Sequence, residues 1–318
     1  MSFLIQQTLI YAVPLMIVAL AGVFAERSGI INLALEGIMI FGAFIGVLFV
    51  RQMQGLEAFT AAKAAGDWGT LQGLVLLAML MSAAMGALFS LLLSFASINL
   101  RADQTIGGTA LNLLATALAM VIAKGVNHSA SAKLDYSNRA FIYDFGPLTV
   151  NVFLFIGLVA LILSYIVLYK TRLGLRLRAC GEHPQAADSV GINVYKMRYI
   201  GVLISGVLGG IGGMAYIIPS VSSWNFEVGV SGAGFLALAV MIFGQWKPFR
   251  IFLAAVFFAL FKSLANIASS IPFLAELGWT QNMYNMIPFI ASMIILAFTS
   301  KKSRAPKAEG IPYDKGSR

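Results

Sequence analysis

Two groups of polar residues interrupt apolar stretches of this sequence, and they are the first places where chemistry could occur. Asn32 and Glu36 are four residues apart, so on a helix they would share one face. A second group lies in a later apolar run and consists of Gln104, Thr105, Thr109 and Asn112. Polar side chains inside a bilayer are costly unless they are paired, hydrated or functional. Both groups are therefore candidates to line a passage for a neutral polar solute, with hydrogen bonding between helices as the alternative.

Two ionisable residues within apolar runs leave their roles open. Glu36 is either a packed, hydrogen-bonded structural group or part of a polar pathway, and in the second case it could carry protons in an ion-coupled transporter. Lys262 is the only clear cation in the middle of an apolar run. It could snorkel to the membrane surface, pair with a buried acid or contact a solute.

No set of residues typical of catalysis or metal binding accompanies these polar groups. The sequence has one cysteine, Cys180, and two histidines, which argues against a clustered Cys/His metal site. It contains no phosphate-binding G-x-x-x-x-G-K-[ST] loop and no H-E-x-x-H or G-x-S-x-G motif. We therefore expect no catalytic residue and no cofactor on this chain, so that any hydrolysis of ATP with Mg²⁺ occurs on another polypeptide. An intramembrane enzyme is disfavoured on the same grounds.

The composition predicts a membrane protein. Of the 318 residues, 59% are hydrophobic and 11% charged, whereas soluble domains are about half apolar and a quarter charged. A membrane crossing needs about 20 predominantly apolar residues. Nine segments meet this requirement approximately, namely 3–24, 30–50, 73–96, 107–123, 150–169, 199–218, 232–246, 250–270 and 284–300. We expect an all-α bundle of about nine spans within residues 1–300, followed by a basic cytoplasmic tail at 301–318.

The positions of Lys and Arg predict the orientation of the bundle. If the tail is cytoplasmic, nine crossings place the amino terminus outside, and 16 of the 22 basic residues then lie in cytoplasmic segments against 5 in external ones. The positive-inside rule favours this topology, and the cytoplasmic position of 170–198 does not depend on the number of earlier spans. The net charge of +9 therefore indicates membrane orientation rather than nucleic-acid binding. The external loops 51–72 and 124–149 are expected to be irregular polar caps that could meet an outside partner.

The cytoplasmic segment 170–198 contains a predicted short helix. Pro184 suits the first turn of a helix and Gly191 suits its end, which leaves about seven helical residues with little apolar surface. A helix this short is marginal in water and would be held by packing on a partner. A simple loop that follows the positive-inside rule is the alternative.

Small residues and one weak internal repeat indicate a tightly packed bundle. Ser205, Gly209 and Gly213 are four residues apart, as are Gly206 and Gly210, a spacing that lets helix backbones approach closely. Residues 108–115 also resemble residues 232–239, and the predicted topology runs these two segments in opposite directions. Opposed repeats of this kind build the central sites of many transporters, with chance similarity of simple sequences as the alternative.

Three separated motifs give the sequence a family resemblance. They are the run Glu26-Arg27-Ser28-Gly29 through Asn32 to Glu36-Gly37-Ile38-Met39, the element Ala102-Asp103-Gln104-Thr105-Ile106, and the stretch from Arg178 to Ile192. In this order they resemble the permease subunits of bacterial ABC importers of the branched-chain amino acid and ribose type, which depend on a binding protein. The resemblance extends over nearly the whole chain and is greatest to the nucleoside and simple-sugar permeases.

This resemblance implies a type II-like permease with inverted repeats in the bacterial cytoplasmic (inner) membrane. The expected partners are membrane lipid, ABC ATPase subunits, a second permease that is homologous or identical, and an extracytoplasmic substrate-binding lipoprotein. The stretch 178–192 matches the ATPase-facing loop of the family, so the resemblance assigns coupling roles to Arg178, Gly181, Glu182, Pro184, Ala187 and Gly191. The implied mechanism is alternating access, in which ATP binding and hydrolysis on the partner subunits drive solute import.

The same motifs are most similar to those of purine-nucleoside permeases, which implies guanosine or inosine as the solute. A simple sugar, riboflavin or a branched-chain amino acid carried by the same machinery is the main alternative, and an ion-coupled secondary transporter is a further one. Phe41, Phe44 and Trp246 could stack on a base, although aromatic residues also pack in membrane cores.

Overall fold

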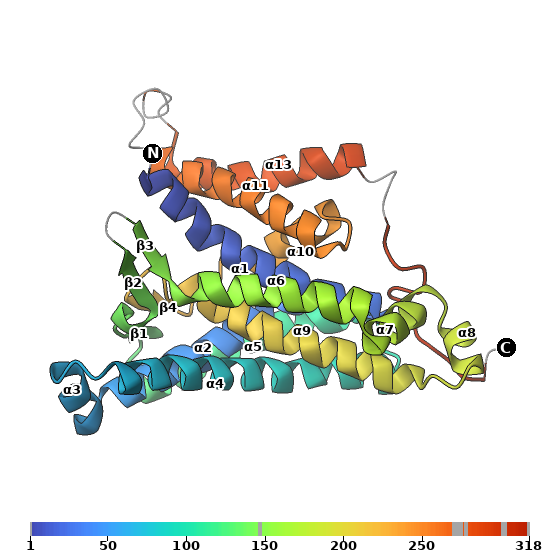
Figure 1. Ribbon diagram of the computed structural model, residues 1–318, viewed down its shortest axis with the longest axis horizontal. Helices are drawn as coiled ribbons and strands as arrows, with labels where there is room; N and C mark the ends of the chain where they lie inside the picture. Colours follow the sequence, from blue (N-terminus) through green and yellow to red (C-terminus); the bar gives the residue numbers. More distant parts are fainter. Residues whose placement is uncertain (1, 146–147, 269–275, 277–278, 300–303, 317–318) are drawn as a thin grey trace.

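The computed structural model describes the chain except residues 1, 146–147, 269–275, 277–278, 300–303 and 317–318. Helices dominate the fold (Figure 1). They are α1 (Ser2–Arg27), α2 (Leu35–Gln54), α3 (Glu57–Ala64), α4 (Trp68–Ser94), α5 (Gln104–Asn127), α6 (Val152–Lys170), α7 (Arg172–Glu182), α8 (Pro184–Ser189), α9 (Val194–Ile217), α10 (Ala233–Phe243), α11 (Pro248–Ile267) and α13 (Gln281–Thr299). A π-helical turn, η1 (Phe95–Asn99), extends α4, and η2 (Arg139–Phe141) is a 3₁₀ turn.

Seven helices of the described part are long and apolar enough to cross a membrane, namely α1, α2, α4 with η1, α5, α6, α9 and α11. They confirm seven of the nine expected spans in position, and α13 coincides with the expected segment 284–300. The segment expected at 232–246 is different, because α10 has only 11 residues. Such a helix is about 16 Å long and is too short to cross a hydrocarbon core of about 30 Å. The segment 232–246 is therefore only partly helical, and the expected count of nine helical spans is not confirmed.

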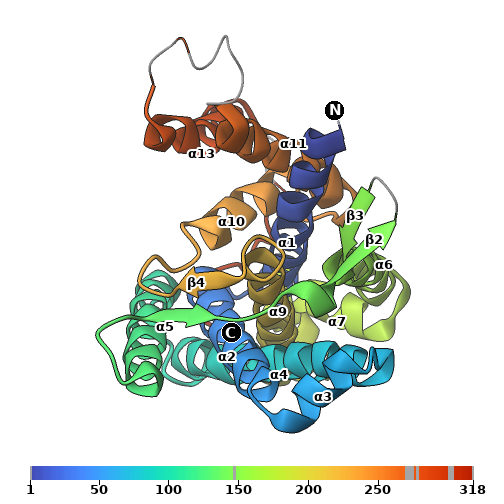
Figure 2. The same ribbon diagram turned by 90° about the vertical axis from the view of Figure 1, so that its left-hand side faces the viewer.

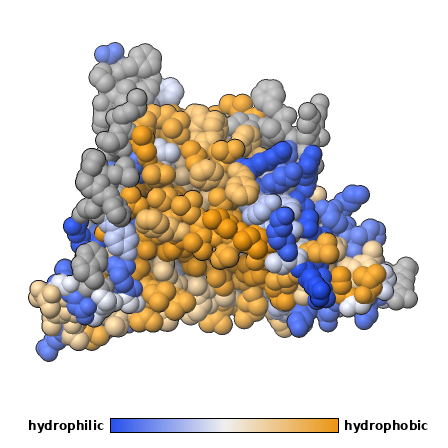
Figure 3. Space-filling view, in the orientation of Figure 1, coloured by the Kyte–Doolittle hydropathy of each residue, from blue (hydrophilic) through white to orange (hydrophobic). Residues whose placement is uncertain are grey.

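The two ends of the bundle differ in character. Figure 1 shows α3 and the strands at one end and α7, α8 and the carboxyl-terminal segment at the other. A broad apolar zone separates these polar ends in the space-filling view (Figure 3). We name the end with α3 and the strands the external end and the end with α7 and α8 the cytoplasmic end, following the topology predicted from the sequence. The orientation places the carboxyl ends of α1 and α6, where Arg27 and Lys170 lie, on the cytoplasmic side.

The external end is more ordered than the sequence suggested. Helix α3 occupies the first external loop, and two small antiparallel sheets form in the second. Strand β1 (Lys133–Asp135) pairs with the distant β4 (Ser223–Asn225), and β2 (Ile142–Phe145) pairs with β3 (Leu148–Asn151). These short sheets satisfy backbone groups that irregular caps would leave to water.

Helix α9 lies in the middle of the bundle, against α1, α2 and α4 (Figure 2). The predicted small-residue faces explain this position. Gly206 and Gly210 face Gly86 of α4, where an added Cβ on Gly86 would come within 2.9 Å of the Gly210 Cα. On another face, Gly213 packs on the backbone of Met39 in α2. Because only hydrogens separate these backbones, the helices approach closely and gain dispersion contacts along their length.

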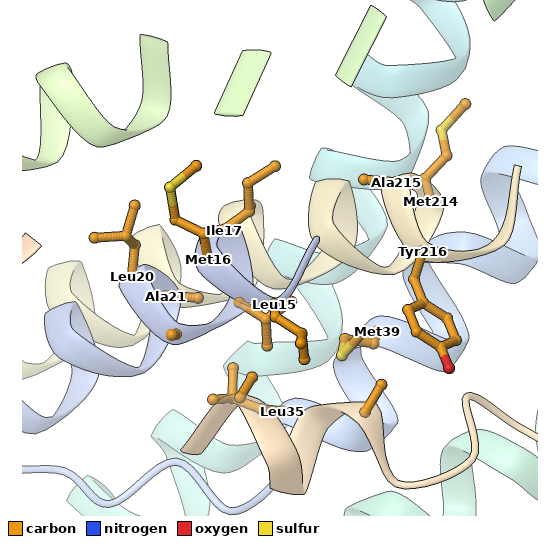
Figure 4. Packing of buried hydrophobic residues seen from close by; sticks show 14 of the residues in the cluster. Leu15, Met16, Ile17, Leu20, Ala21, Leu35, Met39, Met214, Ala215 and Tyr216 are labelled. Atoms are coloured by element: carbon orange, nitrogen blue, oxygen red, sulfur yellow. The ribbon is translucent and has the colours of Figure 1, made fainter. Parts of the chain in front are cut away.

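The apolar core fills the space around these crossings. Figure 4 shows Leu15 and Leu20 of α1, Leu35 of α2, and Met214 and Tyr216 of α9 within one cluster. Leu20 and Leu35 are fully buried. The apolar core thus holds both α1 and α2, the helices before and after residues 28–34, against α9.

The close helix crossing can be tested on α4 with two glycines that have different surroundings. Gly86→Ala should destabilise the protein by about 1–3 kcal/mol, because its methyl group meets the α9 backbone. Gly73→Ala is the matched control, since a Cβ at Gly73 meets nothing within 4 Å. Thermal unfolding in detergent would measure both variants. Equal melting temperatures would contradict the backbone contact.

Candidate functional site

A break in the first two helices forms the centre of the candidate site. Helix α1 ends at Arg27, and α2 does not begin until Leu35. Ser28 Oγ donates a hydrogen bond of 2.6 Å to the Ala25 carbonyl, and Gly29 follows with φ +95°. A residue with a side chain would be strained in that conformation. The chain therefore turns back at residues 28–34, and the expected span at 30–50 begins as a non-helical connection.

Side-chain amides from other helices satisfy the exposed backbone groups of this connection. The Ile31 N–H donates to Gln104 Oε1 at 2.7 Å. Asn112 of α5 accepts from the Gly37 N–H at 2.7 Å and donates to the Leu33 carbonyl at 2.9 Å. Asn32 donates to Ser205 Oγ of α9 at 2.8 Å. Non-helical backbone within a membrane requires such partners, so these three predicted residues are bound to protein groups in this conformation.

Glu36 joins α2 to the half-helix α10. Its two carboxylate oxygens accept hydrogen bonds from the N–H groups of Gly232 (2.8 Å) and Gly234 (2.6 Å) at the start of α10. The amino end of a helix carries a partial positive charge and free N–H groups, which a carboxylate stabilises. Gly234 has no room for a side chain, because a Cβ there would contact Glu36. The structure thus shows the hydrogen-bonded form of Glu36 rather than a free carboxyl group.

Thr105 and Thr109 lie on the other face of α5. Both are exposed, and Thr109 Oγ1 bonds only to carbonyls of its own helix among the described residues, those of Thr105 and Ile106. Exposed apolar residues such as Leu113 share this face. The second group of polar residues predicted from the sequence therefore lies on two different faces of α5. Gln104 and Asn112 hold the connection 28–34, whereas the two threonines face lipid or a partner.

Both segments of the weak internal repeat lie beside the start of α2. Gly108 in the first copy packs on Leu33, and Gly234 in the second packs on Glu36. Helices α5 and α10, which begin near these glycines, therefore flank the start of α2. In the topology predicted from the sequence, these two helices run in opposite directions.

The predicted coupling segment forms two short helices at the cytoplasmic end. Thr171 Oγ1 caps α7 by accepting from the Gly174 N–H at 3.2 Å. Helix α8 begins at Pro184, as predicted, and Gly191 follows it with φ +83°, which suits a glycine. Arg178 of α7 lies over the Tyr169 ring at 4.9 Å. This contact and the cap orient α7 relative to the end of α6.

The coupling residues separate into a buried set and an exposed set. Gly181, Pro184 and Ala187 are buried and seat the two helices on the bundle. A Cβ on Gly181 would contact the backbone of Arg27, so α7 lies directly on the end of α1. Glu182 is exposed and pairs with Arg27 at 3.3 Å. The solvent-facing surface of α8 includes Ala186 and, just beyond it, Val190, which is 74% exposed.

The other candidate residues lie in packed or peripheral positions. Phe41 packs with Phe89, Phe44 packs edge-on with Phe226, and the Trp246 indole donates to Glu26. Lys262 is partly buried beside Tyr11 and Tyr216 and makes no ion pair with a described residue. At the external end, a cavity of about 730 Å³ between α3 and β2 is lined in part by Phe59, Lys63 and Tyr143.

The sequence analysis missed the role of residues 304–316. They were expected to be a basic tail, but Pro306, Ala308 and Tyr313 are buried against the cytoplasmic end. The aromatic residue Tyr313 within the basic tail was a signal that this segment packs on protein, whereas its neighbour Ile311 is exposed. Arg198 of α9 was also missed as a core residue, since it is almost fully buried.

The role of Glu36 can be tested by separating structure from transport. Glu36→Ala leaves two backbone N–H groups without acceptors and should lower stability by about 1–3 kcal/mol for each unsatisfied group. Glu36→Gln keeps one acceptor oxygen and should lose less. Glu57→Ala, at an exposed position on α3, is the control. A Glu36→Gln protein that melts normally but transports nothing would instead support a role in the pathway.

Comparisons with known proteins agree with this geometry. The family model described as the branched-chain amino acid transport system permease component matches residues 4–297. The chain is 40% identical to the guanosine ABC transporter permease NupQ of Bacillus subtilis, over 100% of this chain and 98% of the relative. It is also 40% identical to the nucleoside ABC transporter permease NupC of Lactococcus lactis, over 99% and 98% of the two chains.

A more distant relative is the nucleoside ABC transporter permease NupB of Lactococcus lactis, which is 27% identical over 53% of this chain and 46% of the relative. No solved structure matches the chain significantly. The matched family and the full-length relatives are permease components, and the described part has seven helices suited to crossing a membrane. The chain therefore belongs to the branched-chain amino acid transport system permease family, as a multi-pass inner-membrane subunit of an ABC transporter whose ATPase is a separate polypeptide.

Proposed function

We propose that this chain is the permease subunit of an ATP-driven importer of purine nucleosides such as guanosine and inosine. The observation that carries the proposal is the 40% identity, over essentially the whole chain, to permeases named for guanosine and nucleoside transport. The motifs around Glu36 and Gln104 point to the same solute class. A neutral solute is also compatible with a site whose carboxylate and amides are bound to the protein backbone.

The cytoplasmic geometry supports a route by which an ATPase moves the helices. The exposed surface of α8 is the surface that we assign to ATPase contact. Movement of α8 and α7 would reach the end of α1 at Gly181, where the backbones of α7 and α1 are in contact. From there the connection 28–34 leads to Asn112 of α5 and, through Glu36, to α10. A closing ATPase pair would therefore displace the elements that surround the break, as alternating access requires.

The remaining partners are assigned to the other surfaces. The exposed α5 face with Thr105 and Thr109 is the surface that we assign to a second permease, so that these hydroxyls line the passage between two subunits. The similarity to both NupC and NupB of one organism supports a partner that is homologous rather than identical. The external end, with α3 and the short sheets, is assigned to a substrate-binding lipoprotein.

Solute identity can be tested in vesicles that contain the permease, its ATPase, the second permease and the lipoprotein. Labelled guanosine should accumulate only when ATP is available to the ATPase. Excess inosine should compete, whereas ribose, riboflavin and leucine should not. Uptake that follows a proton gradient without ATP, or competition by one of these three solutes, would contradict the proposed function.

ATPase contact can be tested with two exposed valines on opposite sides of the protein. Val190→Asp should weaken ATPase binding by about 10- to 100-fold, because it places a charge within the proposed interface. Val228→Asp is the matched control, since Val228 is 60% exposed at the external end. Co-purification of the ATPase with each permease variant gives the measurement. Equal binding by both variants would contradict the assigned surface.

A further inference from the structure

Residues 304–316, which we name the clasp, run across the cytoplasmic end of the bundle beside α7 and α8 (Figure 1). The clasp has two sides. Pro306, Ala308 and Tyr313 face the protein and are buried. Arg304, Lys307 and Lys315 are exposed, so the basic residues of the tail are not the ones that hold it in place.

Two backbone hydrogen bonds tie the clasp to the coupling route. The Ala308 N–H donates to the Gly181 carbonyl of α7 at 2.8 Å. The Gly310 N–H donates to the Gly29 carbonyl, in the connection 28–34, at 3.2 Å. Gly310 has φ +75° and lies against Ile31, so a larger residue would be strained there. One short segment thus bonds to both the ATPase-facing helices and the helix break.

Two side chains extend this attachment to α9 and α5. The Tyr313 ring is only 4% exposed and packs edge-on against Tyr195 of α9, with ring centroids 5.4 Å apart. The Asp314 carboxylate accepts two hydrogen bonds of 3.1 Å from Arg101, just before α5. A bidentate pair of this kind fixes orientation as well as distance. The clasp therefore joins four separate parts of the cytoplasmic end.

Glu309 places an acid at the centre of the clasp. Its carboxyl group hydrogen-bonds to Glu26 at the end of α1, and the Trp246 indole donates to the same Glu26. Burial raises the pKa of Glu309 to about 7, while its hydrogen bond to Glu26 and the charge of Arg27 act in the opposite direction. Arg198 of α9 is a buried basic residue in this region and lies near Tyr313.

We propose that the clasp is a coupling element, with Tyr313 and Asp314 as positioning residues that make α7, the connection 28–34 and the start of α5 move together. The reason is geometric. Helices α7 and α1 meet at Gly181 and through the Arg27–Glu182 pair, and the clasp adds backbone hydrogen bonds to α7 and to the connection 28–34, with a further anchor at Arg101. This inference rests on the proposed function, because it needs an ATPase to supply the movement.

The first test measures coupling in the complete reconstituted complex, as solute imported per ATP hydrolysed. Asp314→Arg and Arg101→Asp should each lower this ratio severalfold with the ATPase still bound. The double charge exchange should restore at least half of the loss, because the ion pair is rebuilt with its ends reversed. Tyr313→Ala should also uncouple, while Lys307→Ala, an exposed position on the clasp, should not.

The second test measures clasp docking in the permease without its ATPase. Spin labels on Lys307→Cys and Gln185→Cys report the distance from the clasp to α8, since both positions are exposed. The native Cys180 is buried, and burial raises its thiol pKa to about 11, so it should escape labelling. A single narrow distance is expected, and Tyr313→Ala should broaden it.

The same labels test the acid pair. The folded pKa of Glu309 lies above its ordinary value of 4.5, so docking is strongest at low pH and weakens as pH rises through about 7. Between pH 6 and pH 8 the docking constant should fall by up to about tenfold. Glu309→Gln should weaken this dependence, because an amide does not titrate in this range and only Glu26 of the acid pair remains.

The outcomes are separable. The proposal would be overturned if Tyr313→Ala releases the clasp but leaves the ratio of solute imported per ATP hydrolysed unchanged in a working complex. A broad label distance in the unaltered clasp would overturn it as well. A wild-type complex that does not transport nucleoside would contradict the proposed function and, with it, the coupling role, even if the labels show a docked clasp.

Discussion

The structure depends on the need to satisfy backbone hydrogen bonds where helices are broken inside a membrane. No water is available in the hydrocarbon region to bond free N–H and C=O groups. The connection 28–34 and the start of α10 are both such places, and each is completed by side chains from other helices. Asn112 and Glu36 therefore hold the two breaks against the same end of α2. Loss of either residue exposes backbone rather than only removing a side chain.

The second constraint is the close approach of helices that permits these bonds. Side-chain amides have a short reach, so α5 and α9 must lie near the connection before Gln104, Asn112 and Ser205 can bond to it. The glycines of α9 provide that proximity, because they let α2 and α4 contact its backbone. Helix packing and these hydrogen bonds thus depend on each other. A bulky substitution at one of the glycine contacts of α9 would therefore also disturb the hydrogen bonds to the connection 28–34.

At the cytoplasmic end, the same connection meets the surface assigned to the ATPase. Gly181 permits close approach to the backbone at the end of α1, and Gly29 provides the positive φ where the chain turns back. The clasp bonds to the carbonyls of these same two residues. The clasp, whose basic residues Arg304, Lys307 and Lys315 are exposed, is thus attached through neutral and acidic residues. Force applied to α7 would reach the helix break along short, directional contacts.

The sequence by itself determined the membrane class, the family and the start of α8, because hydropathy and local motifs depend on nearby residues. It also identified the glycine faces of α9 and the polar residues around Glu36. Only the tertiary structure decided that α10 is a half-helix, that Asn112 and Thr109 lie on different faces of α5, and that the tail is docked. These features depend on partners such as Gly37 and Arg101, which lie far away in the chain, and no local pattern encodes such pairings.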